Sequence, residues 1–311
     1  MTTRSAEMGS RGISVVLGSY NRKGFLKLTV DSIRRELQAA DFPHEIIIVD
    51  GGSTDGTIRW LSRQKDIVSI IQHNRGKWQG KPIGRRSWGY FMNLGFKCAQ
   101  AKYVCMLSDD CLVVPGAIRN GVAYFEKRLS DGIKLGAVPF YFILNYPQTT
   151  DYIVIRFGKH IYLNHGIYLN EALRCVGYAD EESYRFYAAD ADLSFRMISR
   201  GYSIEPCSDS RIIHFSHINI GARMSNYSMI EDSKAFEIKW AAMLSESSCE
   251  STPQLLTLAN QHFSSSHIYR HSIGLRCTLM RTRVLAKLES SATIRRIARA
   301  LQAQLARQSQ S

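Results

Sequence analysis

Short apolar runs that end in polar clusters divide the first third of the chain. Residues 13–17 and 46–49 are continuously apolar and rich in β-branched side chains, as in strands buried on both faces of a parallel sheet. Residues 67–71 and 103–107 predict two more strands. Apolar residues at helical spacing predict helices over residues 25–38, 58–61 and 87–101. Strand and helix alternate, which predicts an α/β fold with a central, mostly parallel, twisted sheet flanked by helices.

The second half of the chain mixes the two patterns. Apolar runs predict strands over residues 135–143, 152–157, 203–206 and 211–215. Amphipathic spacing predicts helices over residues 190–201, 228–247, 252–262 and about 274–307. We therefore expect a second, mixed part of the same domain, followed by a helical extension.

The composition is that of a globular protein. Of the 311 residues, 45% are hydrophobic and 22% are charged, which excludes collagen-like and wholly disordered chains. The seven cysteines are odd in number and show no C-x-x-C spacing, so we expect reduced, mostly buried thiols. Residues 1–14 contain no apolar segment typical of a signal peptide, and no apolar stretch is long enough to span a membrane. These features predict a cytoplasmic protein.

Basic residues gather near the C-terminal end of the sequence. The net charge is +13, and from His262 to Ser311 nine basic residues accompany a single acidic residue, Glu289. This balance favours an anionic partner: nucleic acid, an acidic lipid surface or a phosphorylated substrate. A nucleic-acid-binding protein is one alternative, but no helix-turn-helix, zinc module or RNP-like strand supports it. Peripheral binding to the inner face of a membrane and a solvated helix packed on the domain remain open.

Polar clusters follow three of the predicted strands. These are Gly18–Asn21, Asp50–Asp55 and Ser108–Asp110. Ligands of open α/β sheets bind beyond the carboxyl ends of the strands, so the three clusters are expected to meet on one rim. None of them is a P-loop or a G-x-G-x-x-G motif, which argues against ATP-binding and dinucleotide-binding sites.

The acidic residues on this rim suit two kinds of contact. Asp109 and Asp110 would repel each other unless a cation or basic neighbours compensate them, and Mg²⁺ or Mn²⁺ is the natural cation for oxygen ligands. A solvated turn is the alternative for this pair. Asp50 could accept a hydrogen bond from a nucleobase, or its loop could simply connect a strand to a capped helix.

Three further groups could take part in chemistry. Arg85 and Arg86 lie in a basic, glycine-rich loop before a predicted helix, an arrangement that suits a diphosphate or merely a solvated loop. Asp190 and Asp192 open a helix, so one could cap it while the other acts as a general base. His214, with His217 nearby, could contact a metal or a phosphate, or be structural.

Taken together, these motifs resemble family-2 glycosyltransferases of the GT-A fold. The matching runs are residues 13–22 (ISVVLGSYNR), 45–57 (EIIIVDGGSTDGT), 93–95 (NLG), 103–110 (YVCMLSDD), 176–181 (VGYADE) and 190–196 (DADLSFR), followed by Gly201-Tyr202. Their order and spacing cover about residues 12–220. The resemblance implies a glycosyltransferase domain over 12–245, with a nucleotide-sugar half (12–110) and an acceptor half (111–245). Residues 246–311 would form a helical, basic extension.

The resemblance also implies a role for each matched position. The nucleotide-sugar donor would be held by Gly18, Tyr20, Asp50, Gly52, Ser53, Arg85, Arg86, Asn93 and Asp109. Asp110, with His214, would bind Mn²⁺ or Mg²⁺, and Asp190 would be the catalytic base. The implied reaction is inverting transfer of a sugar, from a UDP-sugar or else a dTDP- or GDP-sugar, to a hydroxyl of a glycan or lipid-linked glycan.

The sequence departs from the family pattern at three positions. Ser108 stands at the first acidic position of the D-x-D signature, Gly51 at the second acidic position of the nucleotide loop, and Ala189 at the position of the Glu before the catalytic Asp. These departures weaken the implied ribose, base and acceptor contacts, respectively. They also leave a non-catalytic nucleotide-sugar-binding protein as an alternative function.

Overall fold

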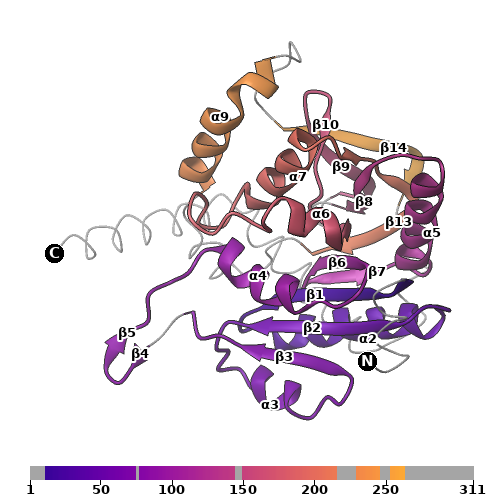
Figure 1. The fold of residues 1–311 in the computed structure, drawn as a ribbon. Coiled ribbons are helices and arrows are strands. Elements are labelled where there is room, and N and C mark those ends of the chain that lie inside the picture. The colour runs from indigo at the N-terminus through magenta and orange to yellow at the C-terminus, as the bar shows by residue number, and fades with distance from the viewer. Residues whose placement is uncertain (1–10, 75–76, 144–148, 216–228, 246–252, 263–311) are drawn as a thin grey trace.

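The computed structural model describes residues 11–74, 77–143, 149–215, 229–245 and 253–262. A curled central sheet of mixed strands runs through the molecule, with helices on its faces (Figure 1). Along the main path of the sheet the strand order is β10-β9-β8-β11-β6-β1-β2-β3. The functional cleft described below lies where the parallel part of this sheet meets the antiparallel part.

The parallel part confirms the four strands predicted in the first third of the chain. Its strands are β1 (Ile13–Ser19), β2 (His44–Asp50), β3 (Ile67–Ile71) and β6 (Tyr103–Ser108). β1 lies between β2 and β6, and β3 pairs with β2, all in parallel register. Ser19 lies opposite Asp50, and Gly18 lies opposite Ser108. The carboxyl ends of the three strands therefore meet on one rim, as predicted.

The antiparallel part is built from the second half of the chain. β11 (Gly166–Leu169) pairs antiparallel with both β6 and β8 (Leu135–Ile143), and β9 (Asp151–Phe157) pairs antiparallel with β8. Four shorter or peripheral strands lie beside these: β7 (Cys111–Val113), β10 (His160–Ile161), β12 (Ser203–Ile204) and β13 (Cys207–His214). β10 pairs antiparallel with β9 and β7 antiparallel with β13, whereas β12 and β13 pair parallel with β8. A separate hairpin consists of β4 (Lys77–Trp78) and β5 (Lys81–Pro82).

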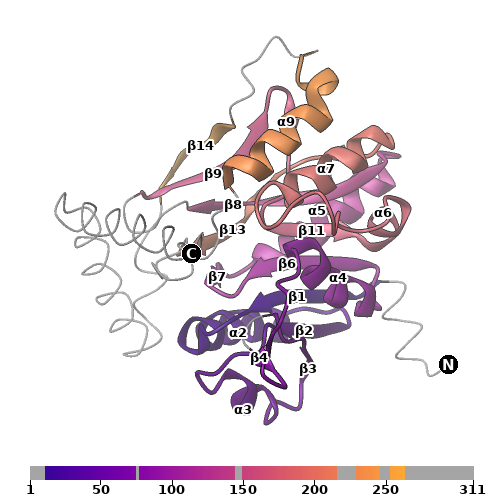
Figure 2. The ribbon, with the colours of Figure 1, turned by 90° about the vertical axis from the view of Figure 1, so that its left-hand side faces the viewer.

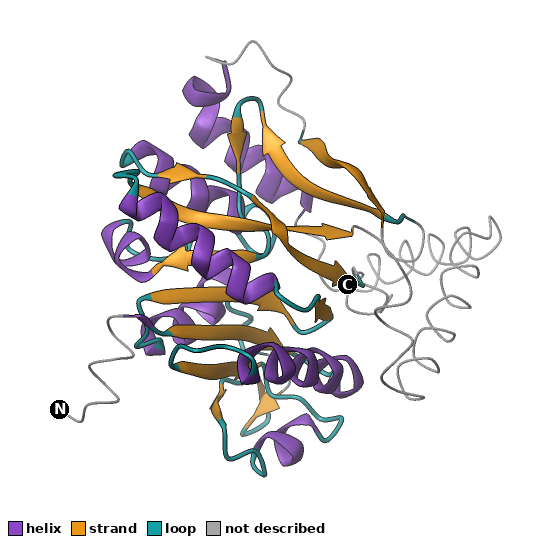
Figure 3. Cartoon of the chain, turned by 90° about the vertical axis from the view of Figure 1, so that its right-hand side faces the viewer, coloured by secondary structure: helices purple, strands orange, loops and turns teal. Residues whose placement is uncertain are grey.

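Helices cover both faces of the sheet. They are α2 (Lys23–Gln38), α3 (Thr57–Leu61), α4 (Trp88–Cys98), α5 (Ala117–Ser130), α6 (Asn170–Cys175), α7 (Ala189–Ser199) and α9 (Met229–Ser245). On β11, Ile167 packs on Gly121 of α5, whereas the neighbouring Tyr168 ring lies 6.2 Å from that of Phe96 in α4. Since the side chains of successive strand residues point to opposite faces of the sheet, α4 and α5 lie on opposite sides of the sheet. α2 contacts α5 and shares its face, the side seen in Figure 3.

One element differs in kind from the sequence prediction. The predicted helix over residues 252–262 is wrong: residues Gln254–His262 form a strand, β14, that pairs antiparallel with β9 (Figures 1 and 2). Exposed and half-buried residues alternate from Pro253 to Ala259, as expected of an edge strand. The leucines, alanine and glutamine of this segment favour a helix, but the open edge of β9 supplies backbone hydrogen bonds that override that preference.

The rest of the predicted C-terminal extension, residues 263–311, lies outside the described residues, and so does the basic amphipathic helix expected there. Within the described part of the chain, none of the helices combines the length and the apolar character needed to cross a membrane.

Candidate active site

A cleft of about 460 Å³ opens at the carboxyl rim of the parallel strands. Both halves of the chain contribute to its wall. The predicted site residues that line it are Gly18, Tyr20, Arg85, Arg86, Asp109, Asp110, Asp190 and His214. The fold thus brings together the residues predicted to bind the diphosphate and the metal and the residue predicted to be the base.

Asp109 and Asp110 are compensated by Arg22, which the sequence analysis did not single out. The guanidinium of Arg22 lies 2.5 Å from Oδ1 of Asp109 and 2.7 Å from Oδ2 of Asp110. The pKa of Asp109 is raised to about 6 in total: burial is the largest cause, Arg22 lowers it, and Asp110 raises it. Burial alone would lower the pKa of Arg22, but the two carboxylates outweigh it and raise that pKa. With both carboxylates ionised, two negative charges and one positive charge leave this buried group with a net charge of −1.

Asp110 also lies beside His214. Its Oδ1 is 3.2 Å from Nε2 of His214, and both side chains are buried at the wall of the cleft. Two ligands of one cation with bonds of about 2.1 Å lie about 3 Å apart, so this spacing suits a shared ion. A carboxylate oxygen and an imidazole nitrogen are suitable donors for a divalent metal. The residues present therefore fit the implied cation.

Asp190 is positioned by a neutral amide. Asn164 donates a hydrogen bond from Nδ2 to Oδ2 of Asp190 at 2.7 Å, and the backbone N–H of Ala191 donates to Oδ1 at 2.9 Å. Burial raises the pKa of Asp190, while these two hydrogen bonds lower it. Ala188, two residues before Asp190, has φ +59°, a left-handed conformation that is costly for alanine and typical of functional sites. A carboxylate held in this way can accept a proton from a hydroxyl.

Asp190 and Asp192 differ in their surroundings. Asp192 is fully buried away from the cleft, where Tyr184, Trp240 and Lys239 contact one of its oxygens and Arg196 contacts the other. Tyr184 and Trp240 donate to Oδ1 at 3.1 and 2.9 Å. Asp192 therefore connects α7 to α9, and Asp190 is the acid of this pair that faces the cleft.

Four predicted donor-binding residues do not line the cleft. Oδ1 of Asp50 accepts from the backbone N–H groups of Gly52 and Ser53 at 2.9 and 2.7 Å, and Oδ2 accepts from the Ser53 hydroxyl at 2.6 Å. The neighbouring Gly51 reaches the cleft instead. Asn93 binds the backbone N–H and C=O of Ala179, and it donates to Glu181. In this structure these residues hold the loops behind the site.

Arg85 and Arg86 lie at the mouth of the cleft, just before the N-terminus of α4. The side-chain amide of Asn74 accepts from the backbone N–H of Arg86 at 2.6 Å and fixes this loop. The Ser87 hydroxyl caps the helix by accepting from the N–H of Tyr90. Two guanidinium groups beside a helix N-terminus favour a phosphate-bearing ligand.

Sequence reasoning missed two polar groups of the cleft, Arg22 and Asn164. Arg22 follows the first polar cluster directly, but its acidic partners lie far along the chain. Asn164 lies between two short strands, and no local pattern marks it. Tyr162 and His165 could be named as pocket side chains from the sequence but not placed; both line the cleft, and Tyr162 stacks on Phe157 with ring centroids 5.6 Å apart. His217 lies outside the described residues.

The comparisons with known proteins agree with this fold. The family model described as "Glycosyl transferase family 2" matches residues 14–179, more than half of the chain. No curated protein matches the chain.

Similar solved structures include the crystal structure of TarS 1-349 from S. aureus in complex with UDP, with 15% identity and a TM-score of 0.50. That match covers 73% of this chain and 65% of the other, so this chain spans less than two thirds of the relative. A mannosyltransferase from Pyrobaculum calidifontis, in complex with GDP-Man and Mn²⁺, has 16% identity and a TM-score of 0.49, over 96% of this chain and 80% of the other. The chain belongs to glycosyl transferase family 2, and its α/β domain has the GT-A glycosyltransferase fold.

Proposed function

We propose that the protein transfers a sugar from a nucleoside-diphosphate sugar to a hydroxyl group of a glycan or lipid-linked glycan, with inversion at the anomeric carbon. The observation that carries the proposal is the single cleft shared by Asp190, the Asp110–His214 pair, Arg85 and Arg86. Membership of the family supports the reaction class. We favour a UDP-sugar as donor, in line with the UDP complex of a protein with the same fold.

Each group has a distinct task in this reaction. Arg85 and Arg86 bind the diphosphate and stabilise the charge that grows on it as the sugar leaves. Gly18 and Tyr20 form the floor on which the nucleoside rests. Asp110 and His214 would hold Mn²⁺ or Mg²⁺, which when bound supplies further positive charge to the leaving group. Asp190 takes the proton of the acceptor hydroxyl while that oxygen attacks the opposite face of the anomeric carbon.

The acceptor side of the cleft is aromatic. Phe157, Tyr162, Phe186 and Tyr187 line it together with Asp190. Flat aromatic faces suit the apolar faces of sugar rings, which supports a glycan acceptor. The basic residues between His262 and Ser311 would attract an anionic membrane surface, where lipid-linked acceptors reside.

A donor screen tests the proposal. Thermal shifts are measured for UDP-, dTDP- and GDP-sugars with Mn²⁺ or Mg²⁺, and the best donor is then followed by release of nucleoside diphosphate with mixed glycan acceptors. We expect one nucleotide class to raise the melting temperature of both the wild type and Asp190→Asn, and only the wild type to turn over. If no donor shifts melting, or if Asp190→Asn retains full turnover, the proposed function is wrong.

A further inference from the structure

One loop on the acceptor side of the cleft presents a basic side chain that the proposed reaction does not use. Residues Arg185, Phe186 and Tyr187 lie in the segment between α6 and α7, and all three line the cleft. We call these three residues the acceptor loop. The rings of Phe186 and Tyr187 lie edge to face, with centroids 5.0 Å apart, and the side chain before them, Arg185, is exposed.

The backbone of the acceptor loop is fixed by hydrogen bonds to two helices. Oδ1 of Asp232 in α9 accepts from the backbone N–H of Arg185 at 2.9 Å. Oδ2 of the same carboxylate accepts from the N–H groups of Phe186 and Tyr187 at 2.9 and 2.8 Å. The backbone C=O of Arg185 accepts from the N–H of Trp88, the first residue of α4, at 2.9 Å. Hydrogen bonds to a carboxylate are strong, so Arg185 extends from a backbone that is already in place.

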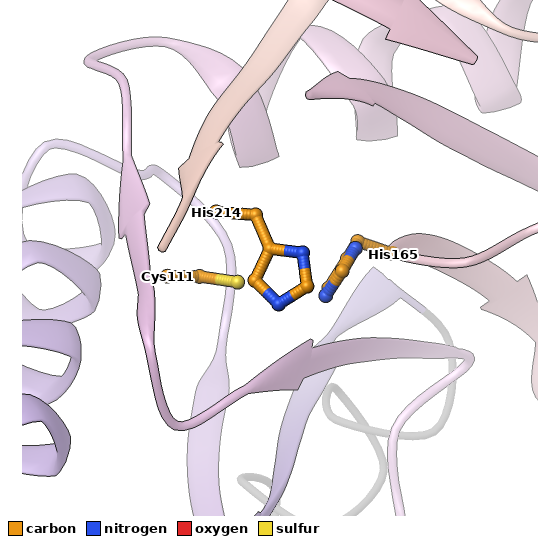
Figure 4. Close-up of side chains that lie close together, drawn as sticks. All are labelled: Cys111, His165 and His214. Atoms are coloured by element: carbon orange, nitrogen blue, oxygen red, sulfur yellow. The ribbon is translucent and has the colours of Figure 1, made fainter. Parts of the chain in front are cut away.

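Several other basic side chains of the cleft have partners within the protein. Arg22 contacts both Asp109 and Asp110. His214 lies 3.2 Å from Asp110, and the ring of His165 lies against that of His214, with centroids 4.5 Å apart (Figure 4). The charge on this wall of the cleft is therefore compensated locally.

Arg185 differs from these groups. Its guanidinium forms no ion pair or hydrogen bond with any residue that the structure describes, although it lines the same cleft. Arg85 and Arg86 lie on the other side of Trp88 in the chain and bind the diphosphate in the proposed reaction. The planar fork of a guanidinium matches the oxygens of a phosphate or a carboxylate. The cleft therefore offers one more guanidinium than the donor and the acidic residues use.

The surroundings of Arg185 point to the acceptor as its partner. The aromatic residues that follow it, Phe186 and Tyr187, offer faces that suit a sugar ring. Asp190, the proposed base, stands at the start of the helix that follows the acceptor loop. An anionic acceptor would be repelled by the carboxylate of Asp190, and a guanidinium in the same cleft offsets that repulsion.

We propose that the acceptor sugar carries a negatively charged oxyanion group, either a phosphate or a carboxylate, and that Arg185 binds this group while Phe186 and Tyr187 contact the sugar ring. The inference rests on the proposed function, and it narrows the acceptor from glycans in general to anionic glycans. Asp232 holds the acceptor loop in the conformation that this contact needs.

Binding of three matched probes tests the proposal on the full chain. Methyl glucoside, methyl glucuronide and methyl glucoside 6-phosphate differ only in the group at one carbon, which is neutral, a carboxylate or a phosphate. Their dissociation constants are measured by ligand-observed NMR in the presence of UDP and Mg²⁺. A charge-assisted hydrogen bond is worth about tenfold in affinity, so we expect one or both anionic probes to bind about tenfold more tightly than the neutral one. The tighter of the two shows which oxyanion the site prefers.

Arg185→Gln should remove this preference. The variant should bind the anionic probes about tenfold more weakly, and the neutral probe and UDP within a factor of about two of the wild type. Arg174→Gln is the matched control, because Arg174 is an exposed arginine of α6 that does not line the cleft; it should leave all four affinities unchanged. Thermal melts confirm that both variants fold.

Three results would overturn the proposal: equal binding of the neutral and anionic probes, no binding of either anionic probe, or a preference that survives in Arg185→Gln. Loss of UDP affinity in Arg185→Gln would also overturn it, because Arg185 would then bind the diphosphate. None of these results affects donor binding by the wild type or its dependence on Asp190. A wild type that binds no donor in the donor screen contradicts the proposed function, whatever the three probes show.

Discussion

Two parts of the cleft wall compensate buried carboxylates in different ways. In one part a guanidinium, that of Arg22, contacts both Asp109 and Asp110, and in the other a neutral amide, Asn164, holds Asp190. The charged arrangement leaves one net negative charge, which suits a site that attracts a cation. The neutral arrangement leaves Asp190 with a raised pKa, which suits a group that takes up a proton. The surroundings of each aspartate thus determine which chemistry its carboxylate suits.

The largest expected effect comes from removing the proton acceptor. Asp190→Asn keeps the shape and the contact with Asn164 but cannot accept a proton from an acceptor hydroxyl. General-base catalysis is worth about 10²–10⁴-fold, so turnover should fall by about 10³-fold while donor affinity stays within a factor of about two. Single-turnover kinetics and donor titration measure the two quantities. A parallel loss of donor affinity would mean that Asp190 binds the donor instead.

Removing the guanidinium beside Asp109 and Asp110 should cost stability. Arg22→Ala leaves two buried carboxylates without their cation and should lower the free energy of unfolding by about 3–5 kcal/mol. Arg34→Ala is the matched control, because Arg34 lies in α2, the helix that begins directly after Arg22, and pairs with the exposed Asp66; its cost should stay below about 1 kcal/mol. Urea unfolding measures both. Equal losses in the two variants would show that the buried charges are compensated in another way.

The raised pKa of Asp109 predicts a pH dependence. Because the folded value is about 6 and the ordinary value is 3.8, the stability due to protonated Asp109 is complete below pH 4 and is lost as the pH rises through 6. Asp109→Asn mimics the protonated form and should gain up to about 3 kcal/mol relative to the wild type between pH 4 and 7. Thermal melts across this range check the prediction.

The exposed Asp66 is the control for this pH series. Its pKa is lowered by Arg34, so Asp66→Asn should show no such gain at higher pH. A constant difference between wild type and Asp109→Asn from pH 4 to 7 would contradict the raised pKa of Asp109.

The smallest effect is expected from the amide that holds Asp190. A hydrogen bond to a charged group is worth about 1.5 kcal/mol, so Asn164→Ala should slow turnover about tenfold at neutral pH. Since this hydrogen bond lowers the pKa of Asp190, its loss should move the acid limb of the kcat/KM profile to higher pH. Asn164→Asp would add a like charge and move the limb further. An acid limb that stays at the same pH in Asn164→Ala would leave Asn164 with a structural role alone.

Local patterns were enough to predict the parallel half of the fold. Continuous apolar runs and the polar clusters after them mark β1, β2 and β6, and the rule for parallel sheets places their ends together. The second half depends on pairings between distant segments. The β14 error arose there, because helix-forming residues adopted the conformation that a neighbouring strand edge imposed.

Only part of the candidate site, too, could be predicted from local patterns in the sequence. Asp110 and Asp190 stand in motifs that the sequence marks, and His214 follows a short apolar run; all three line the cleft. Arg22 is 88 residues from Asp110, and Asn164 is 26 residues from Asp190, so only the folded chain shows either contact. Asp50 is the opposite case, because its place in a motif predicted a ligand contact that the structure does not show. Gly52 and Ser53 are close to Asp50 in the sequence, and they donate hydrogen bonds to both of its carboxylate oxygens.

The pairing of β14 has a practical consequence. Arg156 of β9 pairs with Ile161 on one side and with Gln254 on the other, so β14 covers the outer edge of β9. A bare strand edge is a template for aggregation. A fragment cut at residue 245 would lose this cover, and we expect such a truncated protein to self-associate and precipitate during purification. Expression of the catalytic unit should therefore extend at least through His262.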